Sequence, residues 1–185
     1  MKDMPKLILV LTVICLACSA VLAYVYGITK DPIARALEQK TIRAAAAVLP
    51  EGCGAPRKCS LDGLTYFLAE KGGMPAAIAV DGVSSNGYGG EIVLMVGLGM
   101  DGKLVDFEVV KAAETPGLGM KLGDEEFRGQ LRGRPLSGKW KVKKDGGEIE
   151  AITAATITSR AVMECIDDAV RKYRKISIER YVNAE

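Results

Sequence analysis

Hydroxyl side chains gather in one short segment near the C-terminal end of the chain, residues 150–159. The segment reads Glu-Ala-Ile-Thr-Ala-Ala-Thr-Ile-Thr-Ser, so small residues flank three threonines and a serine. A helical pattern follows directly, where free backbone amides and the positive end of the helix dipole favour an anion, especially a phosphate. A helix cap formed by Thr158 or Ser159 explains the same residues equally well.

A second unusual segment, Glu-Thr-Pro-Gly-Leu-Gly, covers residues 114–119 and follows a predicted strand. Its proline and two glycines favour a tight loop whose backbone amides can approach a planar ligand without intervening side chains. An ordinary loop between a strand and a helix has a similar composition. The segment alone therefore leaves both interpretations open.

The composition excludes several classes of function. The 185 residues include no histidine, which removes Ser-His-Asp, Cys-His and HExxH chemistry. The 25 basic and 23 acidic residues give a net charge of only +2, which argues against nucleic-acid binding. Any redox chemistry must therefore come from a bound cofactor, and the domain is not expected to be an enzyme alone.

The five cysteines do not form a metal-binding pattern. Cys53 and Cys59 flank a short loop and are compatible with a small disulfide outside the cytoplasm. Cys165 lies in a helical pattern, where a buried thiol is expected. No metal site is predicted.

The centre of the chain has the pattern of an antiparallel sheet. Met100-Asp101-Gly102-Lys103 predicts a hairpin turn, because Asp-Gly tolerates positive φ. Residues 51–63 are predicted to be a loop. Apolar runs predict strands at residues 76–80, 91–98 and 104–110, with a short element at 64–70 and a polar loop at 84–90.

A second hairpin is predicted further along, joining residues 139–142 to residues 148–152 through Lys-Asp-Gly-Gly at residues 144–147. Before it, Asp124 is expected to cap a short helix that ends at Leu131.

Two longer helices are predicted in the soluble domain. Asp31 and Pro32 resemble an N-cap and a first helical residue, so one helix is expected to begin at Pro32 and end at Val48. The other begins near Thr158, and its apolar residues recur at helical spacing at positions 161, 162, 165, 166, 169, 170 and 173.

The N-terminus has the pattern of a membrane anchor. Residues 7–28 carry no charge, and about 20 apolar residues cross the hydrocarbon core of a bilayer. Lys2 and Lys6 precede the run, which favours a cytoplasmic N-terminus. A cleaved signal peptide is the alternative, although its apolar region is usually shorter. We therefore divide the chain into an anchor, residues 1–30, and an extracytoplasmic domain, residues 31–185.

The hydroxyl-rich segment resembles the flavinylation motif Asp-x-x-(Ser/Thr)-Gly-Ala-Thr-x-(Thr/Ser)-Ser of the FMN-binding domain family. That family includes the G subunit of the Rnf electron transport complex and the C subunit of the sodium-pumping NADH:quinone reductase. The Glu-Thr-Pro-Gly-Leu-Gly segment and the order of elements are also similar, so the resemblance covers nearly the whole chain. The short length is closer to the Rnf protein.

The resemblance implies a fold, a cofactor and partners. The fold is α+β, with one N-terminal transmembrane helix and a single FMN-binding domain of antiparallel hairpins and flanking helices. A flavin transferase would link FMN through a phosphoester to Thr156. The chain would then relay electrons in an Rnf-type ion-translocating ferredoxin:NAD oxidoreductase, beside other membrane subunits, from the outer side of the cytoplasmic (inner) membrane.

The resemblance also implies roles for the neighbouring residues. Thr115, Gly117 and Leu118 would contact the flavin ring, and Glu114 would hydrogen-bond the flavin or anchor its own loop. The residues expected around the phosphate are Lys121, Thr153, Ala155, Thr158 and Ser159.

Two residues depart from the motif, since Glu150 stands in place of Asp and Ala154 in place of Gly. Both departures are expected to lower the efficiency of modification, because the carboxylate moves outward and the alanine adds a methyl group. Two other functions stay open. One is a free-standing anchored flavoprotein that supplies an extracytoplasmic reductase; the other is a flavin-free assembly protein in which Thr156 only caps the last helix.

Overall fold

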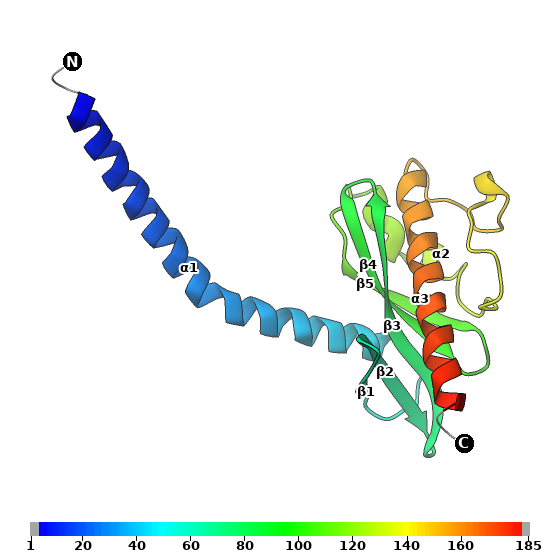
Figure 1. The fold of residues 1–185 in the computed structure, drawn as a ribbon. Coiled ribbons are helices and arrows are strands. Elements are labelled where there is room, and N and C mark those ends of the chain that lie inside the picture. The colour runs from blue at the N-terminus through cyan, green and yellow to red at the C-terminus, as the bar shows by residue number, and fades with distance from the viewer. Residues whose placement is uncertain (1–3, 183–185) are drawn as a thin grey trace. The chain divides into compact units, whose positions relative to one another are not determined.

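The computed structural model describes residues 4–182 (Figure 1). The chain divides into two compact units, Met1–Lys40 and Thr41–Glu185. The first unit is helical. The second contains a five-stranded sheet and the C-terminal helix, which is the predicted α+β class.

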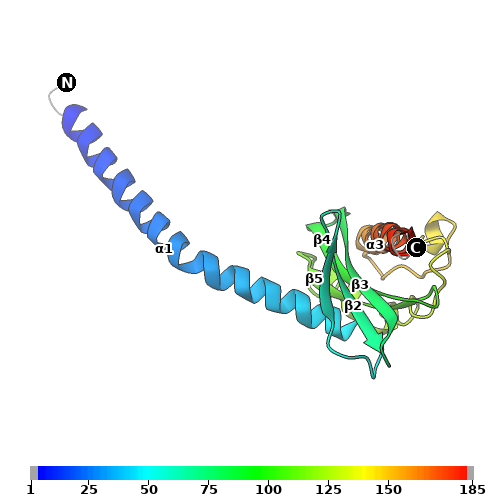
Figure 2. The same cartoon turned by 60° about the horizontal axis from the view of Figure 1, so that its bottom comes forward.

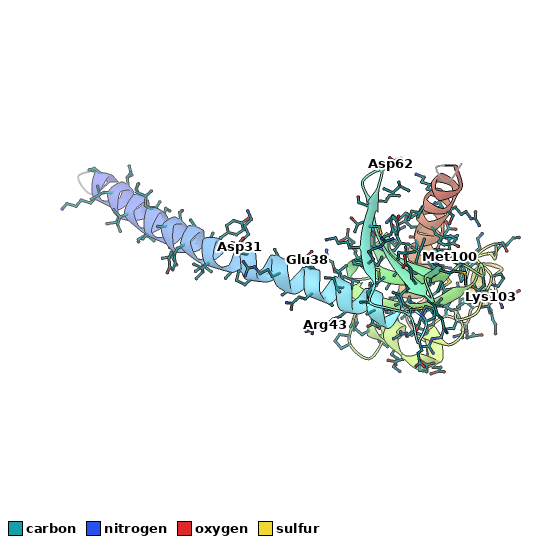
Figure 3. All side chains as sticks on the ribbon, turned by 90° about the horizontal axis from the view of Figure 1, so that it is seen from below. Asp31, Glu38, Arg43, Asp62, Met100 and Lys103 are labelled. Atoms are coloured by element: carbon teal, nitrogen blue, oxygen red, sulfur yellow. The ribbon has the colours of Figure 1, made fainter. Side chains whose placement is uncertain are left out.

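Helix α1 (Met4–Ala47) is continuous and contains Pro32 in its interior. The predicted helix start at Pro32 is therefore wrong, and Asp31 and Glu38 lie on one uninterrupted helix (Figure 3). A proline removes one backbone hydrogen bond, but strong helix formers follow it at residues 34–37, Ala-Arg-Ala-Leu, and the helix continues. By length and composition, Ile8–Ala47 is able to cross a membrane. Lys2, used to predict the orientation, lies outside the described residues.

The sheet is an antiparallel meander in which sequential strands are neighbours. Its strands are β1 (Arg57–Leu61), β2 (Leu64–Lys71), β3 (Met74–Gly87), β4 (Gly90–Gly99) and β5 (Leu104–Lys111). The turn after β4 is the predicted hairpin, with Gly102 at φ +76°. Its chain reversal is fixed by the Gly102 amide, which donates to the Gly99 carbonyl at 3.1 Å.

Helix α3 (Thr156–Val182) lies along one face of the sheet (Figure 2). Alternating strand residues such as Leu94 and Val96 point toward it and form the main core with Ile166 and Val170. The residues between them face the other way, where Met95 packs with Ala45 from the end of α1 and with other small or apolar side chains. Helix α3 therefore covers one face of the sheet, and the last turn of α1 packs on part of the other.

Two predicted loops have more structure than expected. Strand β1 lies inside residues 51–63, which were predicted to be a loop, because Asp62 adopts φ 47° and Gly63 follows at φ 78°. Asp-Gly with two positive φ angles makes the tight turn that pairs β1 with β2. Residues 84–87, predicted to be in a loop, extend β3.

The predicted second hairpin does not form among the described residues. Val142 and Ile149 make a single isolated bridge of parallel type, and the residues between them include the 3-10 turn η2 (Lys143–Asp145). The turn's charged side chains form ion pairs with Glu150 and Arg160. These longer-range contacts override the local preference of Lys-Asp-Gly-Gly for a hairpin.

The remaining local elements are short. Helix η1 (Gly119–Gly123) precedes α2 (Glu125–Arg128), which ends before the predicted Leu131. Asp124 occupies the N-cap position of α2, but its side chain makes no capping hydrogen bond. The disulfide considered between Cys53 and Cys59 does not form either, since both are free thiols.

Candidate functional site

The two segments singled out in the sequence meet in the folded domain. Residues 114–119 follow β5 and end at the first residue of η1, and residues 154–158 include the first turn of α3. Together with the turn between β3 and β4 they enclose a cleft of about 510 Å³. It is lined by Tyr88, Glu114, Thr115, Leu118, Gly119, Ala154, Ala155, Thr156, Ile157 and Thr158.

The floor of the cleft is a buried polar contact. Thr158 Oγ1 donates to Glu114 Oε2 at 2.6 Å, and both side chains are buried. The other oxygen of Glu114 accepts from the Gly89 amide at 3.1 Å. Glu114 therefore ties its own loop to α3 and to the turn between β3 and β4.

Gly119 allows this contact. A Cβ atom at position 119 would lie 2.5 Å from Glu114 Oε2 and 2.9 Å from Thr158 Oγ1. Those separations are far below van der Waals contact, so any side chain would push the loop away from α3. The glycine of the Glu-Thr-Pro-Gly-Leu-Gly segment thus serves close packing between two segments that are distant in sequence.

Thr156 is the first residue of α3 and is half-buried at the edge of the cleft. The Ser159 amide donates to the Ala155 carbonyl at 3.0 Å, which begins the ladder of the helix. By helix geometry, the backbone amides of residues 156–158 have no carbonyl partner within α3. The Thr156 hydroxyl accepts a hydrogen bond from Lys144 Nζ at 3.3 Å.

The predicted N-cap role of Thr158 or Ser159 is wrong, because the helix begins two residues earlier than the pattern indicated. Ser159 is instead fully buried, and its Oγ accepts from the Ile152 amide and donates to the Ala155 carbonyl, both at 2.9 Å. Ser159 therefore links the segment before α3 to the first turn of the helix.

Three other predicted residues lie away from the cleft lining. Lys121 and Thr153 line a separate hollow of about 140 Å³ that also includes Glu150. Gly117 is exposed at φ +75°, in the turn that precedes Leu118. The structure thus brings Glu114, Thr115, Leu118, Ala155, Thr156 and Thr158 together, and separates Lys121 and Thr153 from them.

Several residues near the cleft were not predicted from the sequence. Tyr88 and Ile157 are 71% and 48% exposed, so they form an apolar rim. A lone aromatic residue among the polar and glycine residues 84–90 was the available signal for Tyr88. Lys144 carried no signal, because its turn was interpreted as the loop of a hairpin.

Comparisons with known proteins show the family of this chain. Residues 87–171 match the model of the FMN-binding domain. The G subunit of the ion-translocating oxidoreductase complex of Vibrio cholerae serotype O1 (strain O395) is 31% identical over 180 residues, which cover 88% of this chain and 86% of that protein. The chain belongs to the family of Rnf G subunits.

A second relative from this family comes from a distant bacterium. The G subunit of the proton-translocating ferredoxin:NAD(+) oxidoreductase complex of Clostridium ljungdahlii is 34% identical over 164 residues, covering 88% of this chain and 87% of the relative. Among solved structures, Shewanella oneidensis NqrC aligns over 67% of this chain and 64% of its own, with 22% identity and a TM-score of 0.47. In this Rnf family member, the residues that match the FMN-binding domain model include the entire cleft lining.

Proposed function

We propose that this member of the Rnf family is a membrane-anchored flavoprotein that relays electrons through one FMN, joined covalently to Thr156 by a phosphoester. The observation that carries the proposal is the position of the Thr156 hydroxyl. It lies at the first residue of α3, on the edge of a cleft formed by the two segments that resemble the family motifs.

The residues present fit the phosphate end of FMN. The unpaired amides at the start of α3 and the positive end of its dipole stabilise an anion beside Thr156. The first turn of α3 contains no acidic residue that would repel it. Lys144 adds a positive charge within hydrogen-bonding distance of the ester oxygen.

The cleft also fits a planar aromatic ring. Its volume of about 510 Å³ is within the range of about 300–1,000 Å³ that is usual for small-molecule sites. Leu118 and Ile157 would supply apolar surface for the ring, and Tyr88 would supply an aromatic face. Thr115, which also lines the cleft, would supply backbone polar groups.

Apart from the ester bond at Thr156, the protein's own groups would orient the cofactor and take no part in its redox chemistry. Bound FMN supplies redox chemistry in steps of one or two electrons. Glu114 and Thr158 fix the loop against α3, so the distance across the cleft is set by a buried hydrogen bond. Thr156 would hold the phosphate end of FMN, and the apolar rim would orient the plane of its ring.

Membership of the Rnf family supports the anchor and the partners that we propose. Helix α1 contains a segment able to cross a membrane, and we assign the cleft domain to the periplasmic or extracellular side. Other membrane subunits of an Rnf-type ferredoxin:NAD oxidoreductase would deliver and accept the electrons, and a flavin transferase would attach the FMN. The chain on its own would not complete a reaction cycle.

The experiment replaces the hydroxyl that accepts the flavin. The full-length protein is produced with its membrane complex and flavin transferase, and covalent flavin is read by fluorescence in a denaturing gel and by intact mass. We expect Thr156→Ala and the shape-preserving Thr156→Val to show no flavin fluorescence in the gel. Thr156→Ser should stay fluorescent, because it keeps the hydroxyl.

Thr153→Ala is the matched control, since its hydroxyl belongs to a different hollow. It should carry as much flavin as the wild type. A fluorescent Thr156→Ala protein would show that another residue is modified. A wild-type protein without flavin in its native membrane would favour the flavin-free assembly role, whereas flavin without co-purifying membrane proteins would favour a free-standing flavoprotein.

A further inference from the structure

Two ion pairs join the turn η2 to the segment that contains Thr156, the proposed attachment residue. Arg160 donates two hydrogen bonds to the Asp145 carboxylate, each 2.7 Å long. The Arg160 hydrogen bonds hold the pKa of Asp145 below its usual value, so this pair stays charged at neutral pH. On the other side of the turn, the Lys143 ammonium forms an ion pair with Glu150.

The middle residue of the same turn reaches the reacting hydroxyl. Lys144 lies between the two paired residues, and its Nζ donates to Thr156 Oγ1 at 3.3 Å. Three consecutive residues of one turn therefore contact three positions of a single short segment, from 150 to 160. Gly146, at φ +79°, ends the turn and allows the chain to reverse directly afterwards.

We propose that Lys144 is a positioning residue for the modification of Thr156. Its ammonium holds the hydroxyl oxygen toward the incoming phosphate and then compensates the charge of the phosphoester. The two flanking ion pairs of η2 keep it in place. This inference rests on the proposed function, because it concerns the same attachment site.

The chemistry of the step explains why a cation is useful there. The Thr156 oxygen forms a new bond to the phosphorus of an activated flavin nucleotide, in which that phosphate is part of a phosphoanhydride. The bond from phosphorus to the leaving phosphate breaks, and the hydroxyl proton leaves to a base of the transferase or to water. No electrons are transferred. A neighbouring ammonium stabilises the negative charge that develops on the Thr156 oxygen and the negative charge on the phosphate oxygens.

Two other cations near this segment are already paired, and a third lies apart. Arg160 is paired with Asp145 and Lys143 with Glu150. Lys121, the cation suggested by the sequence, lines the separate hollow with Thr153. Lys144 is the cation for which the described part of the chain records a contact with the Thr156 hydroxyl.

The test measures the initial rate of flavin attachment in a purified system. Full-length apo protein in detergent is mixed with flavin transferase and the activated flavin nucleotide, and adduct is followed by intact mass. We expect Lys144→Gln to lower kcat for attachment by about threefold to tenfold, the range of one typical hydrogen bond in a protein. Lys144→Arg should recover most of the rate.

Lys139→Gln is the matched control, because it removes an exposed lysine from the same loop. It should react like the wild type. Added salt should slow the wild type more than Lys144→Gln, since the attraction that salt screens is already missing in the variant. Thermal unfolding of Lys144→Gln should match the wild type, which a merely structural role would not produce.

The outcomes separate the two proposals. A wild type that acquires no flavin would overturn the attachment at Thr156 and this inference with it. A modified wild type with an equal rate for Lys144→Gln would overturn only the role of Lys144. Equal losses in Lys139→Gln and Lys144→Gln, or a loss in Lys144→Gln that accompanies a lower unfolding temperature, would also overturn that role.

Discussion

Ala154 has a left-handed backbone, with φ 60°, immediately before the helix that begins at Thr156. A residue with a Cβ atom adopts this conformation at a cost of about 1–2 kcal/mol. The family motif has glycine at this position, and the structure supplies the reason. The chain must turn sharply there so that Ala155 and Thr156 can enter α3 on the cleft side.

We predict that Ala154→Gly makes the protein more stable by up to about 1 kcal/mol. Relief of the backbone strain is partly offset by the greater freedom of glycine in the unfolded chain. Urea unfolding of the full-length protein in detergent measures the change. Ala155→Gly is the control and should lower stability, because Ala155 is buried and has no positive φ. A loss of stability in Ala154→Gly would contradict the explanation from strain.

At the scale of elements, the position of the cleft depends on how closely α3 lies on β3. A Cβ atom at Gly82 would be 2.0 Å from the Cys165 carbonyl oxygen in α3 and 3.2 Å from Ala169 Cβ. The helix backbone therefore rests almost directly on the strand. Cys165 is enclosed in this contact, and its burial raises the pKa of the thiol to about 12.

Gly82→Ala should consequently move α3 outward and lower stability by about 1–3 kcal/mol, the usual range for overpacking a core. The same shift would displace the start of α3 from Glu114, so flavin attachment should also slow. Thermal unfolding and the attachment rate are the two measurements. Gly123→Ala is the control, since the nearest atom to its added Cβ is 3.9 Å away. A Gly82→Ala protein as stable as the wild type would show that α3 can move away from β3 at little cost in stability.

Sequence patterns predicted the elements that are defined locally. Strands β3 to β5 follow apolar runs, and α3 follows an apolar stripe of helical period, because burial on one face dictates the residue pattern. The two segments that line the cleft were singled out differently, by their hydroxyl, glycine and proline residues, and those residues alone left an ordinary helix cap and an ordinary loop open. The helical pattern also suggested that Cys165 is buried, which the structure confirms.

Pro32 resembled a helix start, yet α1 continues through it. The other errors occurred where contacts with residues further along the chain are involved. The turn at residues 144–147 resembled a hairpin, but ion pairs with Glu150 and Arg160 hold it differently. The Glu114–Thr158 hydrogen bond joins residues 44 positions apart, and no local pattern reports such a pair.

At the scale of the whole molecule, the side of the membrane on which the cleft lies depends on a few charges. Lys6, together with Lys2, precedes the apolar run, and Lys30 and Arg35 follow it. The bias toward a cytoplasmic N-terminus is small.

We predict that alkaline phosphatase fused after Glu185 is active, because this enzyme matures outside the cytoplasm. Green fluorescent protein fused at the same position would be exported through the same pathway and should not fluoresce. An inactive phosphatase fusion together with a fluorescent one would place the domain in the cytoplasm. That result would also remove the expected access of the flavin transferase to Thr156.

The exposed rim of the cleft has a consequence for how the cofactor is retained. Tyr88 and Leu118 are 71% and 42% exposed, so a flavin between them would remain in contact with water on one side. A ligand held only by such a surface dissociates readily when its free concentration is low. The proposed phosphoester to Thr156 would make occupancy independent of that concentration. The shallow cleft can then keep the ring open to a redox partner without losing it by mass action.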